Sequence, residues 1–270
     1  MRRVLINQLI SLYAWLRKRQ AFELPLLHSL SRHSYFFYKR YFEDPFARLT
    51  TLRRELFTRG HLLDIGANVG YTAVVFASAI KPGDRVFAFE PEAENFRRLA
   101  ENLKKFGVSD RVVASSVAVG AQDGVADIWL NQNHPGDHRI VTDEFREKIQ
   151  KTNSICSVPM VSIDSFVDSN HISKQIGFIK IDVQGYETQV CYGMQRTLEN
   201  NPRATVAIEY APGSMAELGI ATSSLAGFFL ERGFNLYELR RSGKLKMLSQ
   251  GDLKVELDGW INLLCSREAL

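Results

Sequence analysis

The chain has 270 residues, of which 45% are hydrophobic and 24% charged, so it holds enough apolar material for one large domain and an appendage. Its three cysteines, Cys156, Cys191 and Cys265, form no C-x-x-C pair and stand beside no histidine at zinc-ligand spacing, which argues against a structural zinc site and indicates reduced thiols in a reducing compartment. The net charge of +4 is unevenly divided, since residues 1–60 carry +8 and residues 61–270 therefore carry −4.

The basic N-terminal segment predicts an amphipathic helix. Its apolar residues recur at helical spacing: Leu5, Leu9, Leu12, Tyr13 and Leu16. No small-residue cleavage site follows, and the run is too short to cross a bilayer, which takes about 20 apolar residues. Two interpretations stay open. The helix docks on the protein's own core, or residues 1–20 lie on an anionic membrane surface, as suits a basic helix that contains Trp15.

From residue 61 onward, short apolar runs alternate with helical patterns, which is typical of a parallel sheet with crossover helices. The predicted strands are 61–65, 85–90, 112–118, 176–182, 204–209, 234–240 and 259–265, and the predicted helices are 69–80, 93–106, 186–200 and 222–232. An added strand at 125–130 and a polar, unperiodic stretch at 131–156 interrupt the alternation. The sequence therefore predicts an α/β fold, a doubly wound and mostly parallel seven-stranded sheet over residues 60–270, preceded by a helical extension over residues 1–59.

The turn after the first predicted strand holds Asp64, Gly66, Asn68 and Gly70, at the strand end where such sheets bind ligands. The glycines allow a sharp turn and close approach to a ligand. A dinucleotide fingerprint needs further glycines where Asn68 and Tyr71 stand, and no Gly-Lys-Ser/Thr follows for a P-loop. An acid at the strand end instead suits a ligand with an ammonium group, such as the amino-acid end of S-adenosylmethionine.

The next two predicted strands end in further candidates for this ligand. Glu90 follows "RVFAF", where a carboxylate is placed to accept hydrogen bonds from two ribose hydroxyls. Ser116 and Val117 follow the third strand, where they are expected to read an adenine edge and pack on its face, with ordinary strand-end packing as the alternative.

The ordered set "DIGANVGY", "FAFEP", "VAVG" and "IGFIKIDVQGYE" resembles the FkbM family of S-adenosylmethionine-dependent O-methyltransferases over roughly residues 60–210. The resemblance implies a class I, Rossmann-like fold, S-adenosylmethionine as cofactor, and transfer of a methyl group to a small-molecule or glycan hydroxyl. The last motif of the family usually reads I-D-V-E-G-F-E, so Gln184 and Tyr186 are departures.

Three residues are candidates for catalysis. His138 in "NHPGDHRI" is the expected base, because imidazole titrates near neutral pH, and Asp182 is expected to orient it or the acceptor hydroxyl. Glu187 follows Asp182 near a helix start. Arg139 is expected either to hold an anionic acceptor or to lie in solvent. No metal is predicted, although Asp137, Asp182 and Glu209 together form a conceivable magnesium set.

Other functions have weaker sequence support. A nucleic-acid methyltransferase rests on the basic N-terminal segment alone, because the motifs of adenine-N6 and cytosine-C5 enzymes are missing. A non-catalytic, membrane-associated scaffold that binds the cofactor is the other alternative. The expected location is the cytoplasm, with peripheral contact at the inner face of a membrane if residues 1–20 bind lipid.

Overall fold

A computed structural model describes Phe36, Lys39, residues 44–132, His134, and residues 136–149, 154–172, 175–249 and 259–270. The chain divides into two compact units, 1–44 and 45–270, and the second unit is described below. The predicted N-terminal helix and its membrane contact lie outside the described residues. Within the described part of the chain, no helix is long and apolar enough to cross a membrane.

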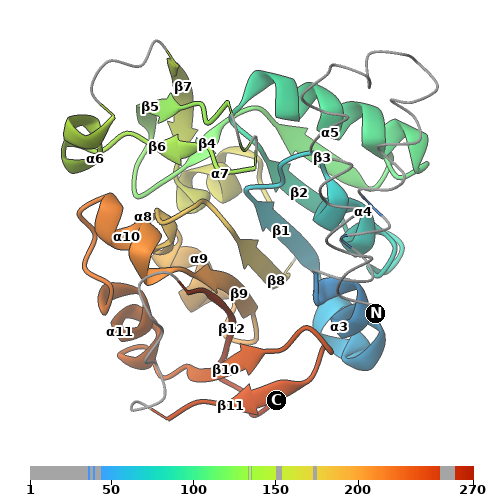
Figure 1. Cartoon of the computed structure of the whole chain (residues 1–270). Helices are drawn as coiled ribbons and strands as arrows, with labels where there is room; N and C mark the ends of the chain where they lie inside the picture. Colours follow the sequence, from blue (N-terminus) through green and yellow to red (C-terminus); the bar gives the residue numbers. More distant parts are fainter. Residues whose placement is uncertain are drawn as a thin grey trace, which may run out of the picture. The chain divides into compact units, whose positions relative to one another are not determined.

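The described part of the second unit is built on an eight-stranded sheet (Figure 1). In chain order its strands are β1 (His61–Ile65), β2 (Val86–Phe89), β3 (Val112–Ser115), β8 (Ile176–Ile181), β9 (Thr205–Tyr210), β10 (Asn235–Leu239), β11 (Leu245–Met247) and β12 (Ile261–Ser266). Their spatial order is β11-β10-β12-β9-β8-β1-β2-β3. The strands from β9 to β3 run parallel, whereas β12 is antiparallel to both of its neighbours and β11 is antiparallel to β10. The predicted α/β fold with a mostly parallel sheet is therefore confirmed, and β11 is a short eighth strand that the sequence did not predict.

Helices cover both faces of this sheet, as the doubly wound prediction requires. One face packs on α3 (Phe46–Leu52), α4 (Tyr71–Ala77) and α5 (Ala93–Lys105), and the other on α7 (Ile163–Ser169), α8 (Glu187–Tyr192), α9 (Gln195–Asn200) and α11 (Ser224–Leu230). The strands contribute side chains to both faces because successive side chains alternate. In β8, Phe178 packs on the side of α3, α4 and α5, and Ile179 packs on the side of α7, α8, α9 and α11. Helix α3 and the 3-10 turn Arg54–Phe57 belong to this unit, which begins at Pro45, and the domain boundary at residue 60 stays a prediction.

The helix predicted over 186–200 is wrong, because the structure has two helices, α8 and α9, separated at Gly193. The break places Gly193 against another segment, since a Cβ on Gly193 would lie 2.0 Å from the carbonyl oxygen of Gly120. Asp164 of α7 accepts hydrogen bonds from the backbone amides of Arg196 and Thr197 in the first turn of α9, at 3.1 and 2.7 Å, and so satisfies the start of that helix. Both contacts come from distant parts of the chain, so local helical spacing did not show the break.

A second, four-stranded sheet in the order β4-β7-β5-β6 lies beside the carboxyl ends of the main strands (Figure 1). Its strands are β4 (Ala118–Val119), β5 (Gly124–Trp129), β6 (Arg139–Ile140) and β7 (Ile155–Val161). The added strand predicted at 125–130 is thus confirmed as β5. Two expectations are wrong: the third main strand ends at Ser115 before the chain passes to β4, and the stretch 131–156 contains β6, α6 (Asp143–Lys148) and the start of β7.

The tight packing of Gly193 gives a test of the helix break. We expect Gly193→Ala to destabilise the protein by about 1–3 kcal/mol, because the new methyl group overlaps the Gly120 carbonyl. Gly227→Ala is the matched control. Gly227 lies within α11 with nothing within 4 Å of an added Cβ, so alanine there should stabilise by roughly 0.5–1 kcal/mol. Urea unfolding followed by circular dichroism measures both, and equal effects would contradict this packing.

Candidate active site

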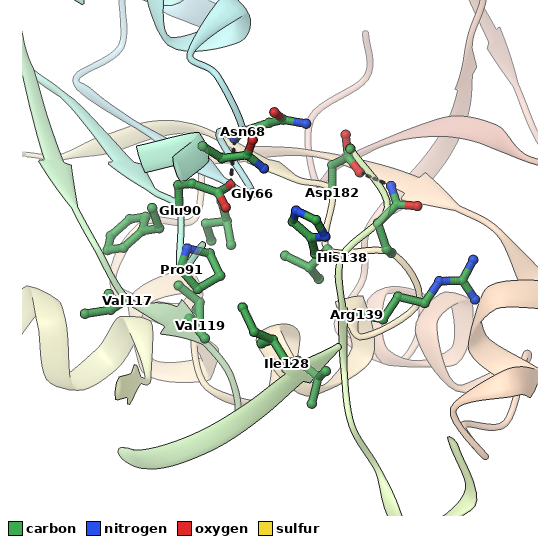
Figure 2. Close-up of a pocket in the computed structure, with 18 residues that line it drawn as sticks. Gly66, Asn68, Glu90, Pro91, Val117, Val119, Ile128, His138, Arg139 and Asp182 are labelled. Atoms are coloured by element: carbon green, nitrogen blue, oxygen red, sulfur yellow. Dashed lines mark hydrogen bonds between the residues drawn. The ribbon is translucent and has the colours of Figure 1, made fainter. Parts of the chain in front are cut away.

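A pocket opens at the carboxyl ends of β1, β2 and β8, between the main sheet and the small sheet (Figure 2). Three kinds of segment line it: the turns after the main strands, the segment between β3 and β4, and the small sheet with the loop before β6. The lining residues that concern function are Gly66, Asn68, Glu90, Val117, His138, Arg139, Asp182 and Gln184. The strand-end position agrees with the general rule for ligand sites in open α/β sheets.

The turn after β1 depends on two glycines and an asparagine with positive φ. Gly66 has φ +77°, and a Cβ there would lie 1.8 Å from the carbonyl oxygen of Asp182. Asn68 has φ 49°, and its backbone amide points toward the end of β2. Gly70, with φ +85°, does not line the pocket but lets α4 begin against Leu99 of α5, whose Cδ1 would lie 2.4 Å from an added Cβ.

Glu90 lies at the end of β2 with its carboxylate held by the neighbouring backbone. Its Oε2 accepts a hydrogen bond from the amide of Asn68 at 2.8 Å, and its Oε1 accepts one from the amide of Glu92 at 3.0 Å. Only 6% of Glu90 is exposed, and this burial raises its pKa to about 7, although both amide hydrogen bonds favour the charged form. Each carboxylate oxygen keeps a lone pair for a ligand, so Glu90 is a fixed acceptor in the pocket (Figure 2).

The two residues predicted after the third strand separate in the structure. Val117 lines the pocket near Glu90, together with Pro91 and Val119 (Figure 2). Ser116 is exposed and does not line it. Val117, the residue predicted to pack on the face of an adenine, therefore lines the pocket, whereas Ser116, the residue predicted to read its edge, does not.

Asp64 lies behind the pocket rather than in its lining. Its side chain is fully buried, and neither carboxylate oxygen has a hydrogen-bond partner among the described residues. The ammonium group of Lys180 lies 3.5 Å from Asp64 Oδ1. Burial raises the pKa of Asp64, and the charge of Lys180 opposes that shift. From the sequence, Asp64 is expected to face the ammonium group of a ligand, whereas in the structure it faces the ammonium group of Lys180.

Asp182, unlike Asp64, lines the pocket together with Glu90 (Figure 2). Its Oδ2 lies 3.3 Å from the ammonium nitrogen of Lys180, and its Oδ1 accepts a hydrogen bond from the side-chain amide of Gln184 at 2.8 Å. The same amide nitrogen of Gln184 donates to Glu209 at 3.1 Å. Gln184, with φ 56°, stands where the resembling family usually has a glutamate, and here an amide joins two carboxylates.

His138, the predicted base, projects into the pocket from the loop before β6 (Figure 2). Its Nδ1 accepts a hydrogen bond from the backbone amide of Asn131 at 3.1 Å, so the neutral ring carries its proton on Nε2. Burial lowers the pKa of His138, while Glu92 and Asp137 oppose that shift. In this tautomer Nε2 donates a hydrogen bond and does not accept a proton.

Arg139 is neither free in solvent nor aimed into the cavity. Figure 2 shows its guanidinium pointing away from the cavity, where it forms ion pairs with Asp137 at 2.7 Å and with Glu217 of α10 (Pro212–Glu217). Asp137 is therefore occupied by Arg139, whereas Asp182 and Glu209 share Gln184. Within the described residues, no group of three His, Cys, Asp or Glu side chains lies close enough together to hold a metal ion.

Glu187, a predicted catalytic residue, holds the turn after β8 instead of lining the pocket. Its Oε1 accepts hydrogen bonds from the amides of Val183 at 3.0 Å and Gly185 at 3.2 Å, and burial raises its pKa to about 7. Sequence reasoning missed Lys180, although a single charge in the apolar strand "IGFIKI" was a visible signal. It also missed Asn131, whose role depends on a backbone amide that no side-chain pattern reveals.

The buried carboxyl of Glu187 predicts a pH dependence of stability. Because its folded pKa of about 7 exceeds the ordinary 4.5, the folded state retains a proton that the unfolded state loses, and stability falls as pH rises between these values. Glu187→Gln keeps the Oε1 acceptor without a charge. We expect it to remove roughly 3 kcal/mol of the decrease in unfolding free energy between pH 5 and 8. The exposed Glu231→Gln is the control in denaturant titrations, and an unchanged pH dependence in Glu187→Gln would contradict the assignment.

Comparison with known proteins places the chain among methyltransferases. The Methyltransferase FkbM domain matches residues 64–236. The hexuronic acid methyltransferase AglP of Haloferax volcanii is 28% identical over 144 residues, which are 52% of this chain and 52% of AglP. The chain therefore spans about half the length of this curated relative.

Solved methyltransferase structures show weaker likenesses. Methyltransferase FkbM from Methylobacillus flagellatus KT has a TM-score of 0.47 and 16% identity, over 77% of this chain and 43% of that one. An O-methyltransferase from Bacillus cereus in complex with SAH has a TM-score of 0.47 and 12% identity, over 82% of this chain and 78% of that one.

FkbM methyltransferases use S-adenosylmethionine, and the residues of the pocket fit that cofactor. The fixed carboxylate of Glu90 suits a pair of ribose hydroxyls, and Pro91 and Val117 provide an apolar surface for a base. The family match spans more than half of the chain and includes the strand ends that build this pocket. The chain belongs to the FkbM family of S-adenosylmethionine-dependent methyltransferases.

Proposed function

We propose that this methyltransferase transfers the methyl group to an oxygen atom of a sugar, with a hydroxyl of a uronic-acid-containing glycan as the preferred acceptor. The observation that carries the proposal is Asp182, a carboxylate that faces the pocket and is held from two sides. A hydroxyl acceptor must lose its proton as the new carbon–oxygen bond forms, and a positioned carboxylate can take it. The acceptor class is supported by the name of the relative from Haloferax volcanii.

The cofactor would be held by the turn and strand ends already described. Glu90 would bind the ribose hydroxyls, the backbone of Gly66 and Asn68 would border the amino-acid end, and Val117 would pack on the base. When bound, the cofactor supplies a methyl group on a positively charged sulfur. The protein's own contribution is to align the acceptor oxygen with that methyl group and to exclude water from it.

In this proposal the base is Asp182, and His138 binds the acceptor. His138 presents Nε2–H because Asn131 occupies Nδ1, so it would donate a hydrogen bond to an acceptor oxygen. Asp182 would take the hydroxyl proton while Lys180 and Gln184 keep its carboxylate in place. The apolar side chains of Ile128 and Ile140 in the small sheet would border the sugar ring.

The cofactor part of the proposal is tested by calorimetry. We expect the protein to bind S-adenosylhomocysteine in preference to NADH, and Glu90→Gln to weaken this binding about tenfold or more by removing a charged acceptor of two hydroxyl hydrogen bonds. Since the pKa of Glu90 in the free protein is about 7, wild-type affinity should rise as pH increases through 7 and Glu90 ionises. Tight NADH binding without S-adenosylhomocysteine binding would contradict the assigned cofactor site.

The division of roles between Asp182 and His138 is tested by turnover. With glycosides of uronic acids and neutral hexoses as acceptors, Asp182→Asn should lower kcat by roughly 10²-fold or more, because the base is lost. His138→Gln preserves a donor at the Nε2 position and should retain most of kcat with a higher KM. If His138→Gln abolishes kcat while Asp182→Asn retains it, the original prediction of a histidine base is the better one.

Mass spectrometry of the acceptors completes that experiment. Addition of one methylene unit to the uronic-acid glycosides supports the acceptor class. Treatment with alkali then separates two products, since a methyl ester on the carboxylate is hydrolysed and a methyl ether on a hydroxyl is stable. A uniformly alkali-labile product would move the reaction from the hydroxyl to the carboxylate.

A lipid-linked form of the acceptor would connect the enzyme to a membrane through residues 1–20. If these residues bind lipid, the protein should sediment with anionic liposomes and be released by high salt, because surface attraction is worth about 1 kcal/mol per basic residue and is screened. Deletion of residues 1–20 should then abolish sedimentation and leave S-adenosylhomocysteine binding intact. If the segment docks on the protein instead, the same deletion lowers the melting temperature and wild-type protein does not sediment.

A further inference from the structure

Lys180 is a buried cation at the back of the pocket. It lies in β8, where the neighbouring side chains Ile179 and Ile181 are fully buried, and only 5% of Lys180 itself is exposed. Its ammonium nitrogen donates a hydrogen bond to the Gly66 carbonyl at 2.9 Å and lies 3.3 Å from an oxygen of Asp182 and 3.5 Å from an oxygen of Asp64. A buried ammonium is costly unless it is paired, so these contacts explain why it is tolerated.

The sheet register brings these groups together. Asp64 and Lys180 are direct neighbours in the parallel pair β1–β8, and both strands then end in the turns that border the pocket. The lysine side chain runs forward from this pair to the Gly66 carbonyl on one turn and the Asp182 carboxylate on the other. A single ammonium thus joins a buried acid to the two pocket turns.

We propose that Lys180 is a positioning residue for methyl transfer, which holds the Gly66 turn and the Asp182 carboxylate in the pocket while it neutralises Asp64 behind them. Its effect on turnover rests on the proposed role of Asp182 as base. Its effect on the Gly66 turn is independent of the role of Asp182, because that turn borders the cofactor site whatever the acceptor is.

The charge balance around Asp182 makes this lysine decisive. The described acids that face Asp182 are Asp64 of β1 and Glu187 of α8, while Gln184 links it to Glu209 of β9. His138 borders the same pocket in its neutral form. Lys180 brings a positive charge to 3.3 Å from the Asp182 carboxylate, so its removal leaves the negative charges of these acids less balanced and favours protonation of Asp182.

The experiment compares Lys180→Met with the double variant Asp64→Asn/Lys180→Met, and uses Lys104→Met on the exposed end of α5 as the matched control. Lys180→Met should lower the melting temperature, because the buried carboxylate of Asp64 loses the cation that neutralises it. The double variant should recover much of that loss, since both buried charges leave together. It therefore supplies a folded protein in which the role of the lysine can be measured.

Two measurements distinguish positioning from simple stabilisation. Calorimetry with S-adenosylhomocysteine should show about tenfold weaker binding in both Lys180 variants, because the Gly66 carbonyl has lost its charged donor, and no change in Lys104→Met. The pH profile of kcat at saturating S-adenosylmethionine, which removes the contribution of Glu90, should show the acid limb at least about one pH unit higher in both Lys180 variants.

A double variant that is folded, binds S-adenosylhomocysteine as tightly as wild type and keeps the wild-type acid limb would overturn the proposal, since the lysine would then only stabilise the fold. If no glycan is methylated by any form of the enzyme, the proposed function fails. The binding measurement still decides the role of Lys180 in that case, because it needs no acceptor.

Discussion

The pocket depends on the close approach of two strand ends, β1 and β8. The amide of Asp182 donates a hydrogen bond to the carbonyl of Ile65 at 3.0 Å, so the parallel ladder continues one step past the strands. This close approach leaves no room for a side chain at Gly66, the residue directly after β1, because a Cβ there would lie 1.8 Å from the Asp182 carbonyl oxygen. The turn after β1, which contains Gly66, and the turn after β8, which contains Asp182, therefore lie in direct backbone contact.

The small sheet supplies the other wall of the pocket, and side-chain contacts join its β6 end to α10. The Thr142 hydroxyl, which follows β6, donates a hydrogen bond to the carbonyl of Leu218 at the end of α10 at 3.0 Å. Arg139 adds the ion pair with Glu217. His138 thus stands on a segment that is tied to α10, so this wall of the pocket is held in place by contacts outside the loop.

Four buried charged side chains near the pocket show how the fold tolerates charge. Glu90 and Glu187 each accept hydrogen bonds from two backbone amides, which favour the charged form of the carboxylate. Asp64 and Lys180 are held by each other across adjacent strands. Burial raises the pKa of all three carboxyls, and the partners determine which of them stays available to a ligand. Glu90 alone among these acids lines the pocket.

The sequence by itself determined the α/β class, the main strands and the positions of Gly66 and Glu90, because apolar periodicity and strand-end residues are local properties. The tertiary structure decided the rest. The break at Gly193 follows from the carbonyl of a distant segment, and the proton position on His138 follows from the backbone amide of Asn131. The sequence assigned Asp64 to the cofactor and Asp182 to catalysis, whereas the sheet register placed Lys180 beside both acids and left Asp64 behind the pocket that Asp182 lines. Asp64 and Lys180 are more than a hundred positions apart in the sequence, so their pairing cannot be read from local pattern and emerged only from the folded chain.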